Sequence, residues 1–545
     1  MPPKKIKKAR KVAVSRKHAV TDLHSAAAKA NFHDVFRFHG ERPRGADFTP
    51  SSTLFEGRFG RMFRTLPAAE FVEEDLKELA RLMVAKREPR ETPETRDDPE
   101  ENQGIPAGYT YLGQFIDHDL TFDPASSLQK QNDPEALEDF RTPRFDLDCV
   151  YGRGPSDQPY LYDDQGLRML LGRRRLTGSG DSRARDLQRN HPEGGRQRAL
   201  IGDPRNDENV IVSQLQSTML RFHNRVVDFM AKGSSFEEVQ NAVRWHYQWV
   251  VLHDFLPTIV GQDVVHDVLP HLKNGTSIRD DEPKLRFFHW KEIPFMPIEF
   301  SAAVYRFGHS MVRPIYRLNT TLKQRNKIFL LDKKNRPPEE NKSLLGFRKF
   351  PSNFAIDWSL FFKMEDAPHL GAKRLQKSYK IDTSLVNPLG NLPKVIGDKV
   401  PSLAERNLIR GWRMGLPSGQ SVARFMGLEP ISDKKLKVGK ATEEDTETNP
   451  LLTKVLPKFR DNAPLWYYIL AEAQQAFEDD STPIKLGPVG GRIVTEVFVG
   501  LLLGDQYSFL SQDPSWKPFE KFTTAEGKFG MAELIKQAKL AQPND

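Results

Sequence analysis

Apolar residues recur at intervals of three and four positions in several long segments of the chain, which is the spacing of one helix face. This spacing predicts helices within residues 71–86, 109–120, 208–232, 239–256, 298–312, 451–477 and 490–503. Proline lacks a backbone N–H donor, so Pro124, Pro257 and Pro314 are expected to end three of these helices. Alternating patterns typical of strands are few and short. We therefore expect a mainly α fold with few short strands.

Polar segments that are rich in charge, glycine or proline separate the predicted helices and are expected to form loops. They cover residues 86–103, 141–154, 173–204, 337–342 and 432–449.

The composition excludes several classes of protein. The net charge of +8, from 81 basic and 73 acidic residues, is small for 545 residues, and no basic stripe is interleaved with aromatic residues. Nucleic-acid binding is therefore not expected. The single cysteine, Cys149, excludes an intrachain disulfide. No apolar run has transmembrane length, and the basic N-terminus lacks the apolar core of a signal peptide. We expect a cytoplasmic protein or one exported by a non-classical route.

One stretch, residues 113–124, overlaps the predicted helix 109–120 and carries several polar groups on an apolar background. Gln114, Asp117 and His118 are spaced i, i+3 and i+4, so they share one helix face. Asp119 is turned by about 100° from His118 and is expected to serve a different site. Buried polar groups need partners, which favours a bound ligand. A hydrogen-bonded core histidine, or a zinc or two-metal hydrolase site, is the alternative interpretation.

Acidic residues alternate in a loop that follows this helix. In extended backbone, Asp146 and Asp148 can face one cation. Thr142 can add a hydroxyl and a carbonyl oxygen, and Arg144 can add its backbone carbonyl oxygen. Oxygen ligands are those that calcium prefers, and Asp119 would supply a third negative charge. Acids on loops are usually only solvated, so the pattern alone leaves both interpretations open.

A further pair lies where a loop meets the predicted helix 208–232. Arg205 and Glu208 are three residues apart and can both point into one site. The alternative is simple capping of the helix by Asn206 or Asp207.

Two more pairs have helical spacing. Arg306 and His309 share a helix face, and Gly308 removes bulk beside His309, as a large flat ligand would require. A glycine that only permits close packing is the alternative. Asn407 and Arg410 lie one helical turn apart, and an asparagine is a suitable partner for an imidazole N–H.

Taken together and in this order, these stretches resemble the animal haem peroxidases of the peroxidase–cyclooxygenase superfamily, in a form that looks bacterial. The resemblance runs from about residue 40 to 505, with motifs at residues 113–124, 142–152, 202–209, 306–309, 407–417 and 486–505. It implies that the pieces build one site in a single large haem peroxidase domain, at residues 36–530. Residues 1–35 are then a flexible basic N-terminal tail, and residues 531–545 a C-terminal tail.

The resemblance implies a role for each candidate residue at the reaction site. His118 corresponds to the distal histidine, Arg205 to the distal arginine, and Gln114 to the glutamine associated with halide and water. His309 corresponds to the axial ligand of the haem iron, and Asn407 to the asparagine that holds its other ring nitrogen.

The resemblance also implies two cofactors, haem b and calcium. Asp117 and Glu208 correspond to acids that form ester bonds to haem methyl groups. Arg306 and Arg410 correspond to arginines near the haem propionates. The calcium ligands would be Asp119, Thr142, Arg144, Asp146 and Asp148.

The implied activity is a peroxidase reaction in which H2O2 converts the haem to an oxo-ferryl state that oxidises halides, pseudohalides or small aromatic donors. Neutral His118 would move the peroxide proton, first as base and then as acid, and Arg205 would stabilise the departing oxygen. Asn209 stands close to where some mammalian members carry a methionine bonded to haem. Bromide, iodide or thiocyanate is therefore expected to be oxidised more readily than chloride.

Two other functions stay open. Cyclooxygenases and related fatty-acid dioxygenases carry a radical tyrosine three residues before the proximal histidine. Here Arg306 occupies that place, and Tyr305 is expected to face about 100° away. The second alternative is a degenerate peroxidase fold without catalysis, because a fold alone does not establish a function.

Overall fold

The structure is a computed structural model of the chain. It describes residues 57–86, 98–121, 138–139, 143–191, 197–291, 293–323, 325–330, 342–364, 375–393, 400–440, 449–478 and 482–542. Three of the expectations above, the N-terminal tail, the loop at 337–341 and the calcium ligand Thr142, lie outside these residues.

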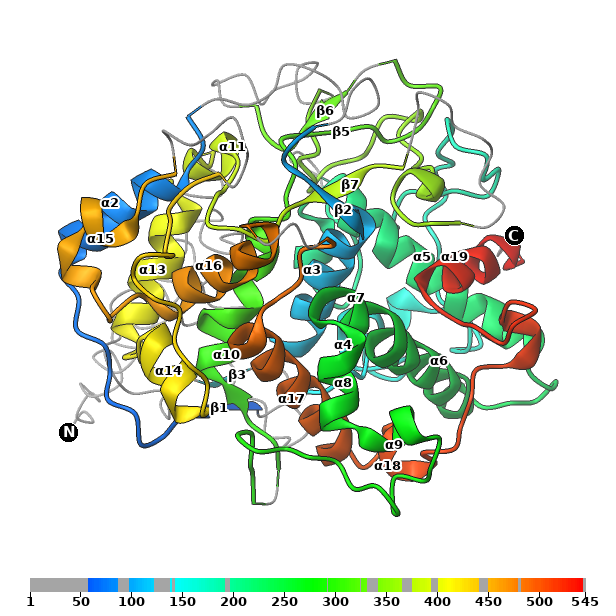
Figure 1. Cartoon of the computed structure of the whole chain (residues 1–545). Helices are drawn as coiled ribbons and strands as arrows, with labels where there is room; N and C mark the ends of the chain where they lie inside the picture. The colour runs from blue at the N-terminus through cyan, green and yellow to red at the C-terminus, as the bar shows by residue number, and fades with distance from the viewer. Residues whose placement is uncertain are drawn as a thin grey trace, which may run out of the picture.

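Helices dominate the described part of the chain (Figure 1). The α-helices are α2 (Glu73–Met83), α3 (Gly108–Leu120), α4 (Asp148–Tyr151), α5 (Val210–Phe229), α6 (Phe236–Val250), α7 (Leu256–Val260), α8 (Gln262–Val268), α9 (Pro270–Asn274), α10 (Ile298–Ala302), α11 (Asn387–Gly390), α13 (Leu403–Arg413), α14 (Gly419–Phe425), α15 (Leu452–Val455), α16 (Leu465–Glu478), α17 (Pro488–Gly504), α18 (Phe509–Gln512) and α19 (Met531–Leu540). Short 3₁₀ helices are η4 (Pro159–Leu161), η5 (Pro204–Asp207), η7 (Val304–His309), η9 (Trp358–Leu360), η11 (Pro457–Phe459) and η12 (Glu520–Phe522), and η6 (Val251–Phe255) is a π-helical turn.

The described strands are short and form three small sheets. They are β1 (Gly57–Gly60), β2 (Glu101–Pro106), β3 (Glu138–Asp139), β4 (Met296–Pro297), β5 (Ile315–Tyr316), β6 (Asn326–Lys327) and β7 (Lys377–Tyr379). β1 pairs antiparallel with β3 and parallel with β4, while β2 with β7 and β5 with β6 form antiparallel pairs. The prediction of a mainly α fold with few short strands is confirmed. Among the described residues, no helix combines the length and the apolar character needed to cross a membrane.

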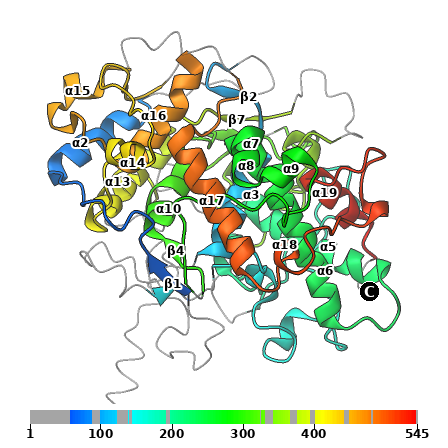
Figure 2. The same cartoon turned by 60° about the horizontal axis from the view of Figure 1, so that its bottom comes forward.

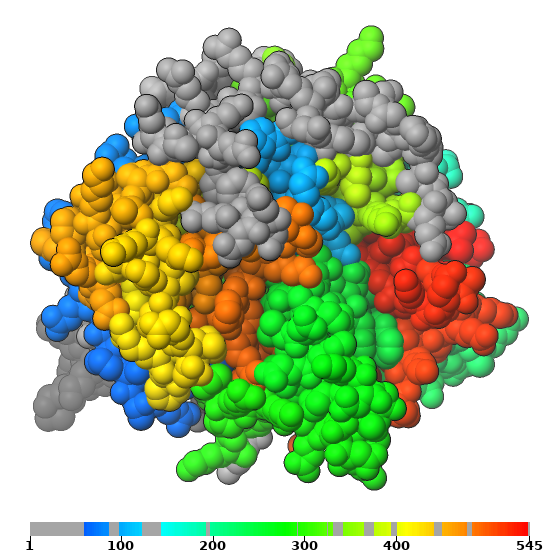
Figure 3. Space-filling view, viewed as in Figure 1, coloured from blue at the N-terminus to red at the C-terminus, as the bar shows by residue number. Residues whose placement is uncertain are grey.

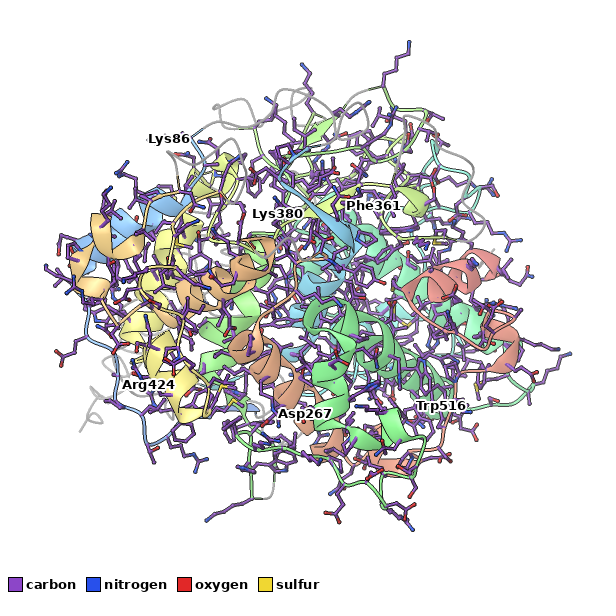
Figure 4. The ribbon with its side chains drawn as sticks, viewed as in Figure 1. Lys86, Asp267, Phe361, Lys380, Arg424 and Trp516 are labelled. Atoms are coloured by element: carbon purple, nitrogen blue, oxygen red, sulfur yellow. The ribbon has the colours of Figure 1, made fainter. Side chains whose placement is uncertain are left out.

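Helix α3 lies in the middle of the fold, where it packs against α5, η5 and η7 (Figure 1). Leu112, Phe115 and Ile116 are buried on its apolar side, as their spacing predicts. At its start, a Cβ on Gly108 would lie 2.5 Å from the carbonyl oxygen of Phe361, which Figure 4 labels. A glycine is therefore required where α3 meets this segment, and the helix is held firmly at its first residue.

Helix α17 runs across the front of the molecule in the view of Figure 2. It contacts α7, α8, α10 and α16 along its length. Nearly all of its residues are buried, including Val497, Leu501 and the ion pair of Arg492 with Glu496. This burial makes α17 a rigid support for the centre of the fold rather than a surface helix.

Two predicted helices are interrupted in ways that the apolar pattern does not reveal. The helix expected to end at Pro257 continues from α6 through the π-turn η6 into α7. Pro257 lies in the first turn of α7, where its missing N–H needs no partner. The helix expected over 298–312 stops at Ala303, which has φ −131° and ψ −72°, and resumes as η7. A 3₁₀ helix has three residues per turn, so Arg306 and His309 still share one face.

The expectation of an exposed loop over residues 86–103 is wrong for its last residues. Glu100, Glu101 and Asn102 are buried, and β2 begins at Glu101. The Arg313 guanidinium lies 2.9 Å from the Glu101 carboxylate, so the buried acid is paired with a buried base. A salt bridge over 212 residues of sequence separation cannot be seen in the local pattern.

The segment expected as a C-terminal tail contains helix α19, which packs against α5. Met531, Leu534, Ile535 and Ala538 are buried in this contact. Figure 3 shows the C-terminal segment, in red, covering the surface beside α6–α9. The packed part of the chain therefore extends to residue 540, and the boundary expected at residue 530 is too early.

His246 of α6 lies under this C-terminal segment. Its ring is packed against Trp516, which Figure 4 labels, and against Phe519 and Phe529. The Ala242 carbonyl can only accept, so His246 Nδ1 carries a proton and donates to it at 2.6 Å. Nε2 then accepts from the backbone N–H of Phe519 at 3.2 Å. Burial lowers the pKa of His246 to about 4, so the folded protein keeps the ring neutral.

This neutral histidine predicts a loss of stability in acid. In the unfolded chain His246 is protonated below its ordinary pKa of 6.5, whereas in the folded chain it is protonated only below about pH 4. Within that window the free energy of unfolding should fall by about 1.4 kcal/mol per pH unit on account of this residue. Urea unfolding of the wild type and His246→Gln at pH 7.5 and pH 5 measures it. Between pH 7.5 and pH 5 the free energy of unfolding should fall by about 2 kcal/mol more in the wild type than in the variant. Equal decreases in the two proteins would contradict the prediction.

Candidate active site

Helix α3, the residues just before α5, and η7 line a cavity that opens to solvent, with an empty volume of about 1270 Å³ that includes the open space at its mouth. The structure brings together six of the predicted site residues here. They are Gln114, Asp117, His118, Glu208, Arg306 and His309. Most of the remaining lining is apolar, with residues such as Phe307, Ile328, Phe347, Leu389 and Leu392. Two histidines from distant parts of the sequence therefore face the same largely apolar space.

His118 is fully buried on α3, and its two ring nitrogens have different surroundings. Nδ1 lies 2.7 Å from Asn206 Oδ1. Nε2 has no hydrogen-bond partner among the described residues and lies 3.8 Å from the Glu208 carboxylate. Burial lowers the pKa of His118 to about 4, and the positive charge of Arg205 acts in the same direction. The imidazole is therefore neutral at physiological pH.

Gln114, Glu208 and Asn209 form a hydrogen-bonded group beside His118. Gln114 Nε2 donates to the Glu208 carboxylate, and Asn209 Nδ2 donates to Gln114 Oε1 at 3.1 Å. Asn209 Oδ1 accepts from the backbone N–H groups of Ile211 and Val212, so it also caps α5. Burial raises the pKa of Glu208 to about 8. Because the two backbone donors fix the Asn209 amide, they also fix which way the Gln114 amide points.

Asp117 and Arg306, which also line the cavity, carry opposite charges and form a pair. The Arg306 guanidinium lies 3.9 Å from the Asp117 carboxylate, and both side chains are largely buried. Arg306 Nε donates to the Ser301 carbonyl at 2.8 Å, which anchors the side chain at the break between α10 and η7. Asp117 also accepts from the Thr121 hydroxyl at 3.3 Å, and its side chain lines the cavity.

His309 ends η7, and Asn407 of α13 holds one of its ring nitrogens. Asn407 Nδ2 and His309 Nδ1 lie 2.8 Å apart. The amide oxygen and nitrogen of an asparagine can exchange places by a flip. A ring that binds a metal through Nε2 carries its proton on Nδ1 and needs the amide oxygen opposite it. Burial, followed by the charge of Arg306, lowers the pKa of His309 to about 3, so its ring is neutral and able to bind a metal.

The two remaining arginines lie elsewhere than expected. Arg205 is buried behind α3 and does not line the cavity. Its guanidinium pairs with Asp203 at 2.8 Å and donates to the carbonyl oxygens of His118 and Thr121. Asp203 directs the side chain there, because it accepts from both the backbone and the guanidinium of Arg205. Its charge therefore acts on His118 through the end of α3.

On α13 the cavity is lined by Arg406 and not by Arg410. These two arginines lie four residues apart on one helix face. Arg406 Nε donates to the Val400 carbonyl at 2.7 Å, which turns its side chain toward the cavity mouth. Arg410 still lies close enough for its charge to lower the pKa of His309.

The predicted acidic cluster is formed on the other side of α3. Asp119, Asp146 and Asp148 place carboxylate oxygens within 4.8 Å of one another, and two of the three residues are buried. Leu147 between the last two has a left-handed backbone with φ 58°, which brings both acids to one side. Arg244 and Gln248 of α6 donate to the backbone carbonyls of residues 146 and 145 and hold the loop in place. Oxygen ligands grouped in this way suit a cation such as calcium.

Sequence reasoning missed three residues that the structure places at the site. Asn206 holds His118 Nδ1, Asp203 holds Arg205, and Arg406 lines the cavity. Asn206 and Asp203 lie within two residues of Arg205, and this proximity in sequence was the signal that could have identified them. Arg406 had no signal beyond its spacing from Arg410.

The residues around the cavity fit a haem. The free lone pair of His118 Nε2 and the neutral ring of His309 offer two nitrogens to one cavity. A Cβ on Gly308 would meet no atom within 4 Å, so this glycine borders open space beside His309. Arg306 and Arg406 at the cavity are suited to pairing with the carboxylates of such a ligand. The apolar lining suits the flat faces of a porphyrin.

Comparison with known proteins agrees with this geometry. The sequence model of the family "Animal haem peroxidase" matches residues 133–538. Helix α3 precedes this range. Thyroid peroxidase from Mus musculus is 24% identical over 282 residues, which make up 50% of this chain and 28% of that protein. Peroxidasin from Drosophila melanogaster is 22% identical over 331 residues, or 59% of this chain and 19% of that protein. The chain thus spans less than a third of the length of these two relatives.

Two solved structures share the fold. Peroxidase A from Dictyostelium discoideum superposes with a TM-score of 0.55 at 16% identity, over 89% of this chain and 93% of that one. A variant of the fatty acid alpha-dioxygenase of Oryza sativa with palmitic acid superposes with a TM-score of 0.51 at 16% identity, over 93% and 85%. The family match covers well over half of the chain, and the mainly helical fold agrees with it. The chain belongs to the animal haem peroxidase family.

Proposed function

We propose that this chain is a haem-dependent peroxidase that uses H2O2 to oxidise bromide, iodide, thiocyanate or small aromatic donors. The observation that carries the proposal is the pairing of His118 and His309 around one cavity. His118 is buried and His309 is partly buried, both rings are neutral, and each has its Nδ1 held by an asparagine. A haem bound between them supplies the redox chemistry, with its iron on His309.

His118 is the residue that moves the proton. Its Nε2 faces the cavity with a free lone pair, so it can accept a proton from the near oxygen of H2O2 and return it to the far oxygen. Arg205 adds a positive charge behind His118 and holds the end of α3 through two carbonyl oxygens. Gln114 and Glu208 present polar groups on the same side of the cavity, where a water or a small anion can bind.

The absence of a methionine at Asn209 supports the choice of donors. Asn209 is committed to capping α5 and to Gln114, so no sulfur is available there for a bond to haem. Steady-state assays with H2O2 test the preference. The haem-loaded protein should oxidise bromide, iodide and thiocyanate and should turn over chloride much more slowly at neutral pH. Efficient chlorination at pH 7 would contradict this preference.

Asp117 and Glu208 are proposed to form ester bonds to haem methyl groups, because both carboxylates line the cavity. After exposure to H2O2, acidified organic solvent should leave haem attached to the wild-type protein. The same extraction should release all haem from the Asp117→Asn/Glu208→Gln double variant, since amides do not form these esters. Wild-type protein that has never met H2O2 is the control. Complete release from the peroxide-treated wild type would contradict the assignment.

Calcium is proposed to occupy the acidic cluster and to fix α3, because Asp119 is the direct neighbour of His118. Removing calcium leaves three carboxylates repelling one another at the helix that carries His118. Chelation should lower the melting temperature and reduce peroxidase activity at least about tenfold, and added calcium should restore both. Asp148→Asn should weaken calcium binding, whereas Asp157→Asn, in an exposed acid, should not. A calcium-free protein with an unchanged haem spectrum and full turnover would contradict the proposal.

A fatty-acid dioxygenase is the second candidate, and Tyr305 is the observation that favours it. Contrary to the expectation that it faces away, Tyr305 lines the cavity four residues before His309. Its ring stacks on Phe300 at 4.7 Å, and its hydroxyl donates to the Gly113 carbonyl at 3.4 Å. A tyrosyl radical after H2O2, lost in Tyr305→Phe, together with O2 uptake in the presence of linoleate, would establish this activity. Without O2 uptake, the peroxidase proposal stands alone.

A further inference from the structure

We propose that Asn206 and Gln216 are positioning residues that fix the tautomer of His118 and so keep its Nε2 ready to accept a proton. This inference rests on the peroxidase function proposed above. The three side chains form a hydrogen-bonded series that starts at the backbone carbonyl of Cys149, which we call the amide relay. A backbone carbonyl can only accept, so it sets the direction of every bond that follows.

Each hydrogen bond of the amide relay sets which atom donates in the next one. Gln216 must turn Nε2 toward the Cys149 carbonyl, to which it donates at 3.4 Å. Its Oε1 then faces Asn206 Nδ2 and accepts from it at 2.9 Å. Asn206 Oδ1 is left facing His118 Nδ1 at 2.7 Å. An amide oxygen can only accept, so the proton of the neutral imidazole lies on Nδ1 and the lone pair on Nε2.

Burial makes this direction difficult to reverse. His118, Asn206 and Gln216 are each 0% exposed, so no bulk water can replace a lost hydrogen bond. Turning either amide over would set two oxygens or two N–H groups against each other. Each such buried mismatch costs about 1–3 kcal/mol. A cost of this size makes the tautomer with its proton on Nε2 a minor species at equilibrium.

Both amide side chains of the amide relay are attached to well-anchored backbone. Asn206 lies in the 3₁₀ turn η5, which Asp203 caps by accepting from the backbone N–H of residue 205. Gln216 lies in α5, which begins directly after this turn. The Cys149 carbonyl also accepts from the backbone N–H of Asp203 at 3.0 Å, which ties the start of the relay to the same turn. The direction of the His118 ring therefore depends on backbone and not on a mobile loop.

The consequence is specific to the proton transfer. A neutral imidazole with its proton on Nδ1 can take a proton at Nε2, and the other tautomer cannot. Hydrogen cyanide provides a probe of this step that involves no turnover, because it must give up its proton to bind ferric haem as an anion. The second-order rate constant for cyanide binding at a fixed pH therefore reports the free Nε2 lone pair, independently of any donor substrate.

The test uses the haem-loaded protein and stopped-flow absorption at one pH, with H2O2 and with cyanide. Asn206→Ala removes the acceptor and should lower both rate constants by about 10- to 100-fold. Asn206→Asp keeps an oxygen toward His118, so both rates should stay within about threefold of the wild type, and its lost hydrogen bond to Gln216 should lower only the stability. Gln216→Met releases the Asn206 amide and should also slow both reactions.

Asn224→Ala is the matched control. Asn224 is a fully buried asparagine of α5 whose side chain is bonded at both ends to the backbone of Met169, away from the cavity. Its loss should lower stability and leave both rate constants unchanged. Wild-type rates in Asn206→Ala and Gln216→Met would overturn the amide relay. If Asn206→Ala fails to fold, a wild-type rate in Gln216→Met alone overturns it. If the wild-type protein binds cyanide but does not react with H2O2, the proposed function is overturned instead.

Discussion

Replacing His118 with glutamine should slow the reaction of the haem-loaded protein with H2O2 by roughly 10²- to 10⁴-fold, the usual contribution of a general acid–base residue. Glutamine has a similar size and can still meet Asn206, but its amide cannot take up a proton. His118 lines the cavity, is neutral, and has a ring nitrogen, Nε2, without a hydrogen-bond partner among the described residues. The loss should therefore fall on the rate of the peroxide step and not on haem content.

Stopped-flow absorption in the Soret band measures this rate directly, with single turnover separating it from donor oxidation. His191→Gln is the matched control, because His191 is exposed and its Nδ1 lies 3.1 Å from Gln197 Nε2. That variant should react at the wild-type rate. A His118→Gln protein that reacts within about threefold of the wild type would remove His118 from the catalytic group.

Replacing His309 with alanine should weaken haem binding by at least about 100-fold. Loss of a hydrogen-bond partner of a metal ligand typically reduces affinity 10- to 100-fold, and here the ligand itself is removed. Titration of the apoprotein with haemin, before any H2O2 is added, measures the affinity without the proposed ester bonds. Asn407 holds the ring of His309, and burial and the charge of Arg306 lower the pKa of this histidine. Its ring is therefore neutral and able to bind a metal.

Added imidazole provides the internal check on this second result. In His309→Gly the truncated side chain leaves room for a free imidazole, which should restore haem binding in part. His266→Ala, at a histidine of α8 whose Nε2 lies 2.7 Å from Gln262 Nε2, should bind haemin like the wild type. Equal haemin affinity in His309→Ala and the wild type would show that another residue binds the iron.

The local pattern predicted those parts of the site that depend on a single element. Gln114, Asp117 and His118 share a face because α3 is a regular helix, and the acidic cluster forms because Asp119 is turned to the other side. Arg306 and His309 share a face in η7 although it is a 3₁₀ helix, since a spacing of three suits both geometries.

The parts that failed depend on side-chain partners and a backbone break that the apolar pattern does not show. Arg205 turns away from the cavity because Asp203, two residues earlier, offers a better buried partner. Tyr305 reaches the cavity because α10 breaks at Ala303, and the apolar pattern runs through that break. Asn206 could not be assigned to His118 from sequence, because 88 residues separate them and only the fold brings them together.

A crystal structure of the haem-loaded protein with calcium would test the central claim most directly. We expect one haem in the cavity between α3 and η7, with iron bound to His309 Nε2 and with His118 Nε2 above the opposite face. We also expect a calcium ion among Asp119, Asp146 and Asp148. A haem held outside this cavity, or iron bound by a residue other than His309, would contradict the account.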